Sequence, residues 1–470
     1  ASNLARWPDL LVALEEFNVP EYLMRVIRDY LRNRILRYET EEGWREKDLS
    51  AGVAQGSIFG PDFWNILFDA LLRLAMPDGV KMFAYADDVA LVISAKNENI
   101  AQHILNTAMR RISEWMVKHG LEIAMAKTEI VPLTWKHINI EFPMTVGTNV
   151  VQTRSEVTYL GIKLDAKLTF LTHLKHVANK AIKKTLQLSR LMANTSGPKS
   201  SKRRLLMTVT TSILLYGSEI WANQMRKETH RSVLSSVQRR GALRVTSAYR
   251  TVSGPAVLVI AGIIPIELQA MERKRTYERK KTEDGTAIVQ KEERQVTMET
   301  WQKTWNQMVK GRWTHVLIRE LAPWVDRRYG EVNYYLTQFL SNHGYFCAYL
   351  SKMGKTQSPG CIFCFADRDD AYHTFFVCHQ WNEERRQVER IFEALTPDNI
   401  ISEMLSAKEK WDAMALFVES VLRKKKPFLD RAIELSANEE RRVRLIPHHN
   451  LEAVAGPIDS GAEGDDEDSS

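Results

Sequence analysis

The chain has 470 residues, of which 44% are hydrophobic and 26% are charged, enough apolar content for two or three packed domains. Lys and Arg total 65 against 58 Asp and Glu, and this net charge of +7 is too modest to identify a nucleic-acid-binding protein by itself. Three of the four cysteines lie within eighteen residues, which argues against a disulfide-linked secreted scaffold. No apolar run has the length of a membrane span and the first residues lack a signal-peptide pattern, so we expect a nuclear or cytoplasmic protein without a membrane partner.

The first third of the chain alternates helix-like and strand-like patterns. In chain order the predicted elements are helices at 10–17, 22–31 and 61–74, strands at 80–84 and 89–93, a helix near 104–116 and a strand at 121–124. The first two strands are joined across Tyr85-Ala86-Asp87-Asp88 and predict a hairpin. The order helix, hairpin, helix, strand is a split βαβ pattern without its first strand.

The rest of the chain changes in composition twice. From about Ala166 to Lys310 it is predicted to be mostly helical and basic, and its charged stretch 272–295 is either an exposed helix or a linker. The region 301–422 is rich in aromatic residues and holds all the cysteines. After Pro427 the sequence becomes polar and then acidic, which predicts disorder.

Two adjacent carboxylates, Asp87 and Asp88, lie between the apolar strands of the predicted hairpin. Two acids at one tight turn concentrate negative charge where it can bind divalent metal ions. Nucleotidyl transfer uses two such metals, about 3.5–4 Å apart, to activate the attacking oxygen and stabilise the leaving one. Because successive strand residues point to opposite faces, a further carboxylate from a neighbouring strand is required. The alternative is that both acids are ordinary solvated turn residues.

Two more segments fit the same chemistry. The small-residue loop Ala51–Ser57 precedes the helix at Pro61 and permits close approach of a nucleotide or a template strand, or it is simply the loop at the start of a helix. Lys127, which follows the predicted strand beyond Gly120, could reach a phosphate, or it is a surface lysine.

Cys361, Cys364, His373 and Cys378 have the spacing C-x2-C-x8-H-x4-C. A C-x2-C knuckle supplies two zinc ligands from one turn, and the following His and Cys can complete a tetrahedron. The alternative, chance clustering of buried cysteines, is disfavoured because three of the four cysteines stand at ligand spacing. Cys347 lies outside the pattern and is predicted to be a core thiol. We therefore expect a structural zinc ion here.

Aromatic, basic and acidic residues surround this cluster. Arg368, Arg385 and Arg386 could contact phosphates, and the aromatic rings could stack on unpaired bases. For most of the rings we favour a place in a small core that the zinc holds together. These rings belong to Phe363, Phe365, Phe375 and Phe376. The neighbouring acids are predicted to form an exposed turn rather than a nuclease site. They are Asp367, Asp369 and Asp370.

The order and spacing of several motifs resemble the reverse transcriptases of type-1, non-LTR (LINE-like) retrotransposable elements, particularly their jockey-related and ribosomal-DNA-inserting branch. Phe83-Ala84-Tyr85-Ala86-Asp87-Asp88 resembles the family's metal-binding box. Residues 52–61 resemble its template and nucleotide loop, although Ala54 replaces the usual Pro. Residues 120–128 are similar to the segment whose lysine assists the departing pyrophosphate. Further resemblances, to the primer-grip strand and the thumb, lie in Tyr159-Leu160-Gly161 and in residues 215–221 and 244–250.

This resemblance implies an RNA-directed DNA polymerase that copies element RNA by target-primed reverse transcription with catalytic Mg²⁺. Its partners would be the element RNA template, target DNA and deoxynucleoside triphosphates (dNTPs). Asp87, Asp88 and Lys127 would be catalytic, with the two aspartates as Mg²⁺ ligands. Template or nucleotide contacts would come from Gln55, Gly56, Ser57 and Tyr85, and the primer grip would include Gly161. In the family the zinc segment is associated with nucleic-acid binding and with endonuclease function.

The implied fold class is α+β: a partial reverse transcriptase palm, which is a split βαβ unit lacking its first strand, then a helical thumb and a zinc-stapled C-terminal segment. The expected boundaries are 1–165 for the palm, 166–300 for the thumb, 301–425 for the zinc region and 426–470 for a disordered polar and acidic tail.

The chain departs from the family pattern at one point. The family's first catalytic Asp lies on a strand that would come just before residues 3–7, so we expect an N-terminally truncated palm with little activity of its own. The runner-up interpretation is a non-catalytic nucleic-acid-binding remnant, and a structural zinc protein without a nucleic-acid role is a third. Salt-sensitive RNA binding would argue against the third.

Overall fold

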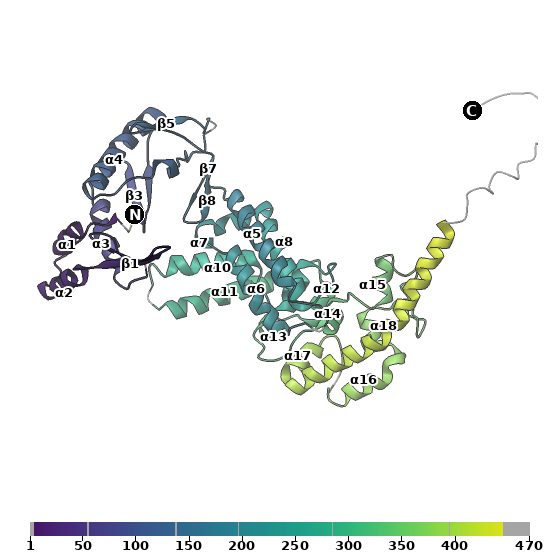
Figure 1. Cartoon of the computed structure of the whole chain (residues 1–470). Coiled ribbons are helices and arrows are strands. Elements are labelled where there is room, and N and C mark those ends of the chain that lie inside the picture. The colour runs from purple at the N-terminus through teal and green to yellow at the C-terminus, as the bar shows by residue number, and fades with distance from the viewer. Residues whose placement is uncertain are drawn as a thin grey trace, which may run out of the picture. The chain divides into compact units, whose positions relative to one another are not determined.

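The computed structural model describes residues 4–53, 56–136, 139–195, 197–283, 285–393 and 395–444. The chain divides into two compact units, Ala1–Thr169 and Phe170–Ser470, which we call unit 1 and unit 2. Unit 1 mixes helices with short strands and every described element of unit 2 is helical, so the fold class is α+β and mostly helical (Figure 1). The regions expected to form a separate thumb and zinc domain share unit 2.

Unit 1 contains four α-helices and four antiparallel hairpins among its described residues. The helices are α1 (Trp7–Glu16), α2 (Glu21–Leu31), α3 (Gly60–Leu72) and α4 (Glu98–Lys118). The hairpins are β1 (Ile35–Thr40) with β2 (Gly43–Asp48), β3 (Val80–Tyr85) with β4 (Asp88–Ile93), β5 (Pro143–Val146) with β6 (Asn149–Gln152), and β7 (Glu156–Tyr159) with β8 (Ile162–Asp165). A 3₁₀ turn covers Met125–Lys127.

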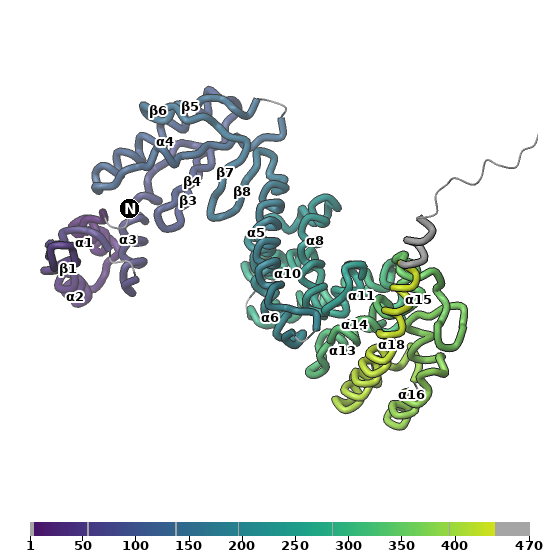
Figure 2. The backbone as a smooth tube through the Cα atoms, turned by 45° about the vertical axis from the view of Figure 1, so that its right-hand side comes forward, coloured from purple at the N-terminus to yellow at the C-terminus, as the bar shows by residue number. Residues whose placement is uncertain are grey.

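The core of unit 1 is centred on α3. Pro61 stands in the first turn of this helix, where its missing N–H leaves no hydrogen bond unmade. The buried stripe of α3 consists of Phe63, Trp64, Leu67, Phe68 and Leu71. It packs against α1, the second half of α4 and the inner face of the β3–β4 hairpin. Figure 2 shows this hairpin beside α4. The helical spacing of apolar residues thus fixes which face of the hairpin is covered.

Some predicted elements of unit 1 differ from the structure. The strand predicted at 121–124 is wrong: among the described residues the segment has no strand partner. Leu121 is buried in the core and Ile123 packs partly buried against it, so the apolar residues of this segment make packing contacts without strand pairing. The sequence also missed β1 and β2, because nearly all of their residues are exposed and no alternation with a buried face marks them.

The helices of unit 2 follow one another through short connections. They are α5 (Leu171–Ser189), α6 (Ser200–Leu214), α7 (Ser218–Trp221), α8 (Glu228–Thr246), α9 (Gly254–Ala261), α10 (Ile266–Arg279), α11 (Thr286–Gln307), α12 (Arg312–Leu317), α13 (Leu321–Val325), α14 (Tyr334–Ser341), α15 (Cys347–Lys352), α16 (Asn382–Glu389), α17 (Ile400–Ser406) and α18 (Lys408–Arg444). Two 3₁₀ turns cover Ala222–Arg226 and His379–Trp381, and a π-helical turn covers His373–Val377.

Unit 2 has two neighbouring cores. One joins α6, α8 and α9 through residues such as Met207 and Val257. The larger one is built from aromatic residues of α11 to α18, including Trp305, Trp324 and Trp411. Cys361 and Cys378 belong to this larger core, so the cysteine cluster is packed into the main core of the unit rather than hanging from it.

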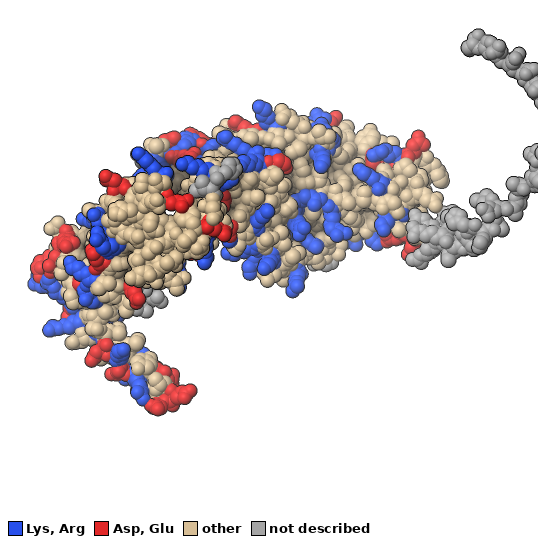
Figure 3. Space-filling model, turned by 90° about the horizontal axis from the view of Figure 1, so that it is seen from above, with Lys and Arg blue, Asp and Glu red and all other residues tan. Residues whose placement is uncertain are grey.

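Basic residues are concentrated at the start of unit 2. Residues 166–218 contain no Asp or Glu. On α5, Lys175, Lys180, Lys183 and Lys184 are exposed, and none has an ion pair among the described residues. Figure 3 shows Lys and Arg side chains gathered along part of one face of the molecule with few acidic ones among them. A surface of this kind attracts polyanions.

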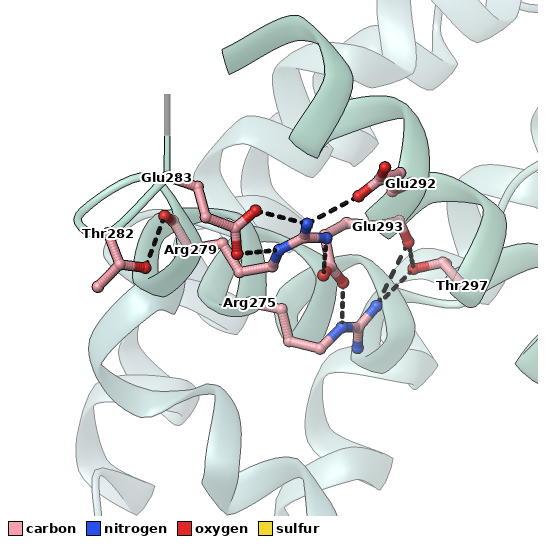
Figure 4. Close-up of polar contacts among 7 residues, drawn as sticks. All are labelled: Arg275, Arg279, Thr282, Glu283, Glu292, Glu293 and Thr297. Carbon is pink, nitrogen blue, oxygen red and sulfur yellow. Dashed lines mark hydrogen bonds and ion pairs between the residues drawn. The ribbon is translucent and has the colours of Figure 1, made fainter. Parts of the chain in front are cut away.

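The charged stretch 272–295 belongs to two paired helices and is not a linker. Arg275 and Arg279 on α10 face Glu293 on α11: Arg275 Nε donates to Glu293 Oε2 at 2.5 Å, and Arg279 Nη1 donates to Glu293 Oε1 at 3.1 Å (Figure 4). Glu283 and Glu292 add two further ion pairs to Arg279. Burial raises the pKa of the Glu293 carboxyl, but the hydrogen bonds from the two guanidinium groups outweigh burial and hold that pKa below its usual value.

Helix α18 continues through Pro427 to Arg444, whereas the sequence predicts disorder beyond this proline. Lys425 and Leu429 on either side of it are fully buried. Packing of this face carries the helix past the proline, although the ring removes one backbone hydrogen bond. No single helix in the described part of the chain is long and apolar enough to cross a membrane, and two bent helix pairs of unit 2 meet that requirement by length and composition alone.

Candidate functional site

The two aspartates of the β3–β4 hairpin lie at its turn. Tyr85 pairs with Asp88, so Ala86 and Asp87 form a two-residue loop, and Ala86 takes the positive φ of 51° that such a tight turn requires. The indole Nε1 of Trp64, on the buried face of α3, donates to the Ala86 carbonyl oxygen at 2.9 Å. This bond fixes the turn against α3, and both carboxylates remain exposed to solvent.

The hairpin has one covered face and one open face. Its inner side chains pack into the core of unit 1, whereas Phe83 and Tyr85 on the outer face are 52% and 68% exposed. Cross-strand pairing places Asp88 opposite Tyr85 on the open side. The turn therefore presents carboxylate oxygens, the ligands that Mg²⁺ prefers, on a surface that a nucleotide can reach.

The other residues predicted for this site come from separate segments. Gln55 lies outside the described residues. Gly56 has a φ of +82°, and the Ser57 hydroxyl accepts a hydrogen bond from the Gly60 amide at 3.0 Å where α3 begins. Lys127 is exposed in the 3₁₀ turn that follows the segment predicted as a strand. Val53, at the start of the loop that contains Gly56 and Ser57, belongs to the core beneath the hairpin, whereas Met125 in the turn of Lys127 packs against a separate cluster around Leu105 and Met144.

Gly161, predicted for the primer grip, lies in a turn and not in a strand. Tyr159 pairs with Ile162 across the β7–β8 hairpin, which leaves Leu160 and Gly161 as the loop. Both loop residues have positive φ, 46° and 77°. Glycine takes this conformation without steric cost, which explains why a glycine stands at the second position.

Cys361, Cys364, His373 and Cys378 come together in unit 2. Their ligand atoms all lie within 4.8 Å of one another, with 3.9 Å between the Sγ atoms of Cys361 and Cys378 and 3.2 Å between Cys364 Sγ and His373 Nε2. Tetrahedral zinc with Zn–S bonds of about 2.3 Å places two thiolates about 3.8 Å apart, so donor set and spacing both fit zinc. The hydrogen bond between the two thiols lowers the pKa of Cys361 and raises the pKa of Cys378.

Backbone hydrogen bonds hold the two halves of this cluster. The Cys361 amide donates to the Ala366 carbonyl at 2.8 Å and closes the knuckle. The Cys378 amide donates to the His373 carbonyl at 2.7 Å and closes the π-helical turn. The four ligands are thus positioned by the local fold of two short turns.

The rings near the cluster divide between core and surface. Phe375 is fully buried, and Phe363 and Phe376 pack partly buried against the same core. Phe365, which was predicted to join them, is 87% exposed. Its φ of 60° turns the chain at this point, and the side chain projects away from the cluster.

The phosphate contact predicted for Arg385 is wrong, because this side chain is 7% exposed and its donors are already used. Its Nε donates to the Phe375 carbonyl at 2.9 Å, and its Nη2 donates to the Cys378 carbonyl at 2.8 Å. Arg385 therefore helps to hold the backbone of the proposed ligand Cys378 in place. Arg368 pairs with Asp370 at 2.9 Å on the surface.

The exposed acidic turn predicted after the knuckle is wrong for Asp369, which is 1% exposed. Its Oδ1 accepts from Lys425 Nζ at 2.6 Å and from Thr374 Oγ1 at 2.8 Å, and its Oδ2 accepts from the Cys347 amide at 2.8 Å. Lys425 is equally buried. Asp369 lies between the second and third ligands in the sequence, so the ion pair ties the metal-binding loop to α18. The neighbouring Cys347 is a core thiol as predicted, and burial raises its pKa to about 12.

Sequence reasoning missed both Lys425 and Trp64. Lys425 does leave a signal, because it occupies a position in the buried stripe of an otherwise apolar helix face. That stripe consists of Val418, Val421, Leu422, Lys425 and Leu429. A lysine at such a position indicates a buried acidic partner elsewhere in the chain. Trp64 leaves no comparable signal, because a tryptophan in an apolar helix is ordinary core.

Comparisons with known proteins agree with the motifs of unit 1. The sequence model of the family described as reverse transcriptase (RNA-dependent DNA polymerase) matches residues 4–164. A retrovirus-related Pol polyprotein from type-1 retrotransposable element R1 2 of Nasonia vitripennis is 24% identical over 416 residues, which cover 84% of this chain and 98% of that protein. A Pol polyprotein from element R1 of Bradysia coprophila is 25% identical over 81% of this chain and 39% of its own length. The RNA-directed DNA polymerase of the mobile element jockey of Drosophila melanogaster is 23% identical over 49% of this chain and 25% of its own length. No solved structure matches the chain.

Proposed function

We propose that the chain takes part in copying element RNA into DNA at a nicked target site. Residues 4–164 match the reverse transcriptase family, and most of the chain is similar to Pol proteins of type-1 retrotransposable elements. The class of enzyme, RNA-directed DNA polymerase, follows from the homology. The observation that carries the rest is the pair Asp87 and Asp88, displayed on an open turn that Trp64 fixes against α3. Element RNA is the template, target DNA supplies the primer end, and dNTPs are the substrates.

The residues of unit 1 divide the work as follows. Asp87 and Asp88 hold catalytic Mg²⁺ through their carboxylates. When bound, two Mg²⁺ ions activate the primer oxygen and stabilise the departing one. Gln55, Gly56, Ser57 and Tyr85 contact template or nucleotide, and the positive φ of Gly56 lets the strand approach the backbone closely. Lys127 places a positive charge beside the pyrophosphate, and the turn at Gly161 supports the primer.

Unit 2 is proposed to bind nucleic acid and one structural zinc ion. The unpaired lysines of α5, in a segment of 53 residues without a carboxylate (166–218), supply phosphate contacts. Cys361, Cys364, His373 and Cys378 hold the zinc. Of the three acids near the cluster, Asp369 is paired with Lys425 and Asp370 with Arg368, whereas Asp367 is exposed and has no ion pair among the described residues, so an endonuclease role would depend on one free carboxylate.

A second function, RNA binding without synthesis, is favoured by one observation. Two carboxylates on successive residues of a turn are fewer ligands than two metals need. In the described part of the chain, the one group of three or more metal-ligating side chains is the Cys/His cluster of unit 2. In this second function the basic surface of α5 and the zinc region bind RNA, and the β3–β4 hairpin has no catalytic role.

Primer extension on an RNA template with Mg²⁺ separates the two functions. Asp87→Asn removes a proposed metal ligand, and Asp78→Asn, at the exposed opposite end of the same hairpin, is the matched control. Synthesis that Asp87→Asn abolishes and Asp78→Asn leaves intact establishes the polymerase. Absence of synthesis by the unmodified chain, together with RNA binding, establishes the alternative.

A further inference from the structure

A groove of about 680 Å³ lies within unit 1 between α1, α2 and the segment that follows β2. Its lining combines apolar and basic residues. The apolar residues are Trp7, Pro8, Leu11, Leu31 and Leu49. The basic residues are Arg25 and Arg28 on α2 and Arg32, the residue that follows the C-terminal end of this helix. This volume falls within the range of about 300–1,000 Å³ typical of small-ligand sites.

The arginines that line the groove leave positive charge unpaired. Arg25 and Arg28 are three residues apart on one face of α2, and Arg32 follows the end of the helix in an extended conformation. Arg28 pairs with Glu15 at 2.9 Å and Glu21 at 3.2 Å. Arg25 and Arg32 have no ion pair within the described ranges, and one carboxylate, Asp29, stands among the lining residues. Two guanidinium groups are therefore available to an anion on an exposed surface.

Trp7 connects the groove to the proposed template and nucleotide loop. Its Nε1 donates to the Gly52 carbonyl at 2.9 Å, and the Gly52 amide donates to the Ala5 carbonyl at 2.7 Å. The indole is thus held in place at the first residue of that loop, with its ring lining the groove. A ligand in the groove lies directly beside the loop.

We propose that this groove holds an unpaired nucleotide of a single-stranded RNA, an assignment that rests on the proposed function. The base lies on Trp7 and Leu11, and the phosphates on either side of it contact Arg25 and Arg32. Arg25 lies on α2 and Arg32 follows the last residue of this helix, so the two guanidinium groups line the groove at separate points and can flank one nucleotide. An RNA duplex cannot make these contacts, because its bases are paired and stacked inside the helix and cannot reach the apolar residues that line the groove.

RNA binding by the whole chain tests the phosphate contacts. The double variant Arg25→Gln/Arg32→Gln is compared with Arg110→Gln/Lys118→Gln, which removes the same charge from exposed positions on α4. Each lost phosphate contact flattens the plot of log K against log salt by about 0.7, so two contacts change the slope by about 1.4 and the dissociation constant by about 25-fold at 0.1 M salt. We expect this loss, measured by fluorescence anisotropy, for a 12-nucleotide single strand and a change below about threefold for the matching RNA duplex. The α4 variant is expected to change both by less than about twofold.

The outcomes distinguish this inference from the proposed function. If the unmodified chain binds no RNA, the proposed function fails with it. If the unmodified chain binds RNA and the two double variants have the same affinity as each other, whether unchanged or reduced, only the groove assignment is overturned. Equal losses on single strand and duplex also overturn it, because they show a backbone contact without an unpaired base. A single strand that contains 5-iodouridine tests the base contact by photo-crosslinking. We expect crosslinks to the peptide that contains Trp7, and crosslinks confined to other peptides would contradict the assignment.

Discussion

Replacing Lys425 by Met removes the cation that neutralises Asp369 while keeping most of the side-chain volume. Both side chains are 1% exposed, and the carboxylate would keep only the hydrogen bonds from Thr374 and the Cys347 amide. Breaking one partner of a buried, hydrogen-bonded ion pair costs about 3–5 kcal/mol, because the remaining charge stays buried without compensation. Lys425→Met is therefore expected to lower the free energy of unfolding of unit 2 by about 3–5 kcal/mol.

Two further variants isolate the charge from the packing. Asp369→Asn combined with Lys425→Met leaves no net charge and keeps an acceptor for the Cys347 amide, so the double variant should be more stable than the sum of the single losses predicts. Lys424→Met is the matched control on the same helix. Its ammonium is 60% exposed and pairs with Glu384 on the surface, so its loss should cost less than about 1 kcal/mol.

Urea denaturation in excess zinc, followed by tryptophan fluorescence, measures these differences. Trp324 and Trp411 are buried in the core that contains the ion pair, so their emission reports its unfolding. The reasoning is refuted if Lys425→Met and Lys424→Met differ by less than about 0.5 kcal/mol, a gap within the ordinary range of surface substitutions. Strict additivity in the double variant would equally show that the two side chains are not coupled.

Three other predictions concern unit 2. Cys361→Ser should abolish stoichiometric zinc, measured with a metal-binding dye after denaturation, whereas Cys347→Ala should retain one zinc per chain; equal zinc in both variants would contradict the ligand set. Arg385→Lys loses two hydrogen bonds of a fixed guanidinium and should cost about 1.5–3 kcal/mol in thermal unfolding, while Arg386→Lys on the exposed side should have no measurable effect, and a similar loss for both would remove the supporting role of Arg385. The pKa of Glu293 is lowered in the folded state, so its ion pairs contribute stability above the unfolded carboxyl pKa near ~4.3 and lose it as pH falls through the folded value. The stability gap between the unmodified chain and Glu293→Gln should therefore be constant from pH 7 to about 5 and shrink below about pH 4, and a gap that widens on acidification would reverse the assigned sign.

Local patterns were enough to predict the β3–β4 hairpin, because two short apolar runs stand on either side of Tyr85-Ala86-Asp87-Asp88. The structure adds the register, in which Tyr85 pairs with Asp88 and the loop shortens to two residues. The ligand spacing at Cys361 and Cys364 is equally local, and the structure brings these residues together with His373 and Cys378. The buried state of Asp369 could not be predicted in this way. Its partner is 56 residues away, and a short acidic run looks the same whether it is solvated or paired.

Helix α18 illustrates a second limit. Pro427 and the polar residues after it favour disorder by composition, yet α18 extends to Arg444. Leu429 is buried, and its packing against Leu350 and Cys347 continues the helix through a position that local propensity disfavours. Tertiary contacts of one face of α18 thus stabilise a helix where the composition alone predicts disorder.

The ion pair between Asp369 and Lys425 has a consequence for how this protein can be divided or recombined. Many small zinc modules are autonomous and can be moved between proteins as cassettes, because metal binding alone folds them. Here the metal-binding loop encloses an anion whose counterion is supplied by a helix that starts thirty residues after the last ligand. A fragment ending before α18 would carry four correctly spaced ligands and a buried charge that nothing neutralises. We therefore expect the Cys/His cluster and α18 to be retained, exchanged or lost together during evolution.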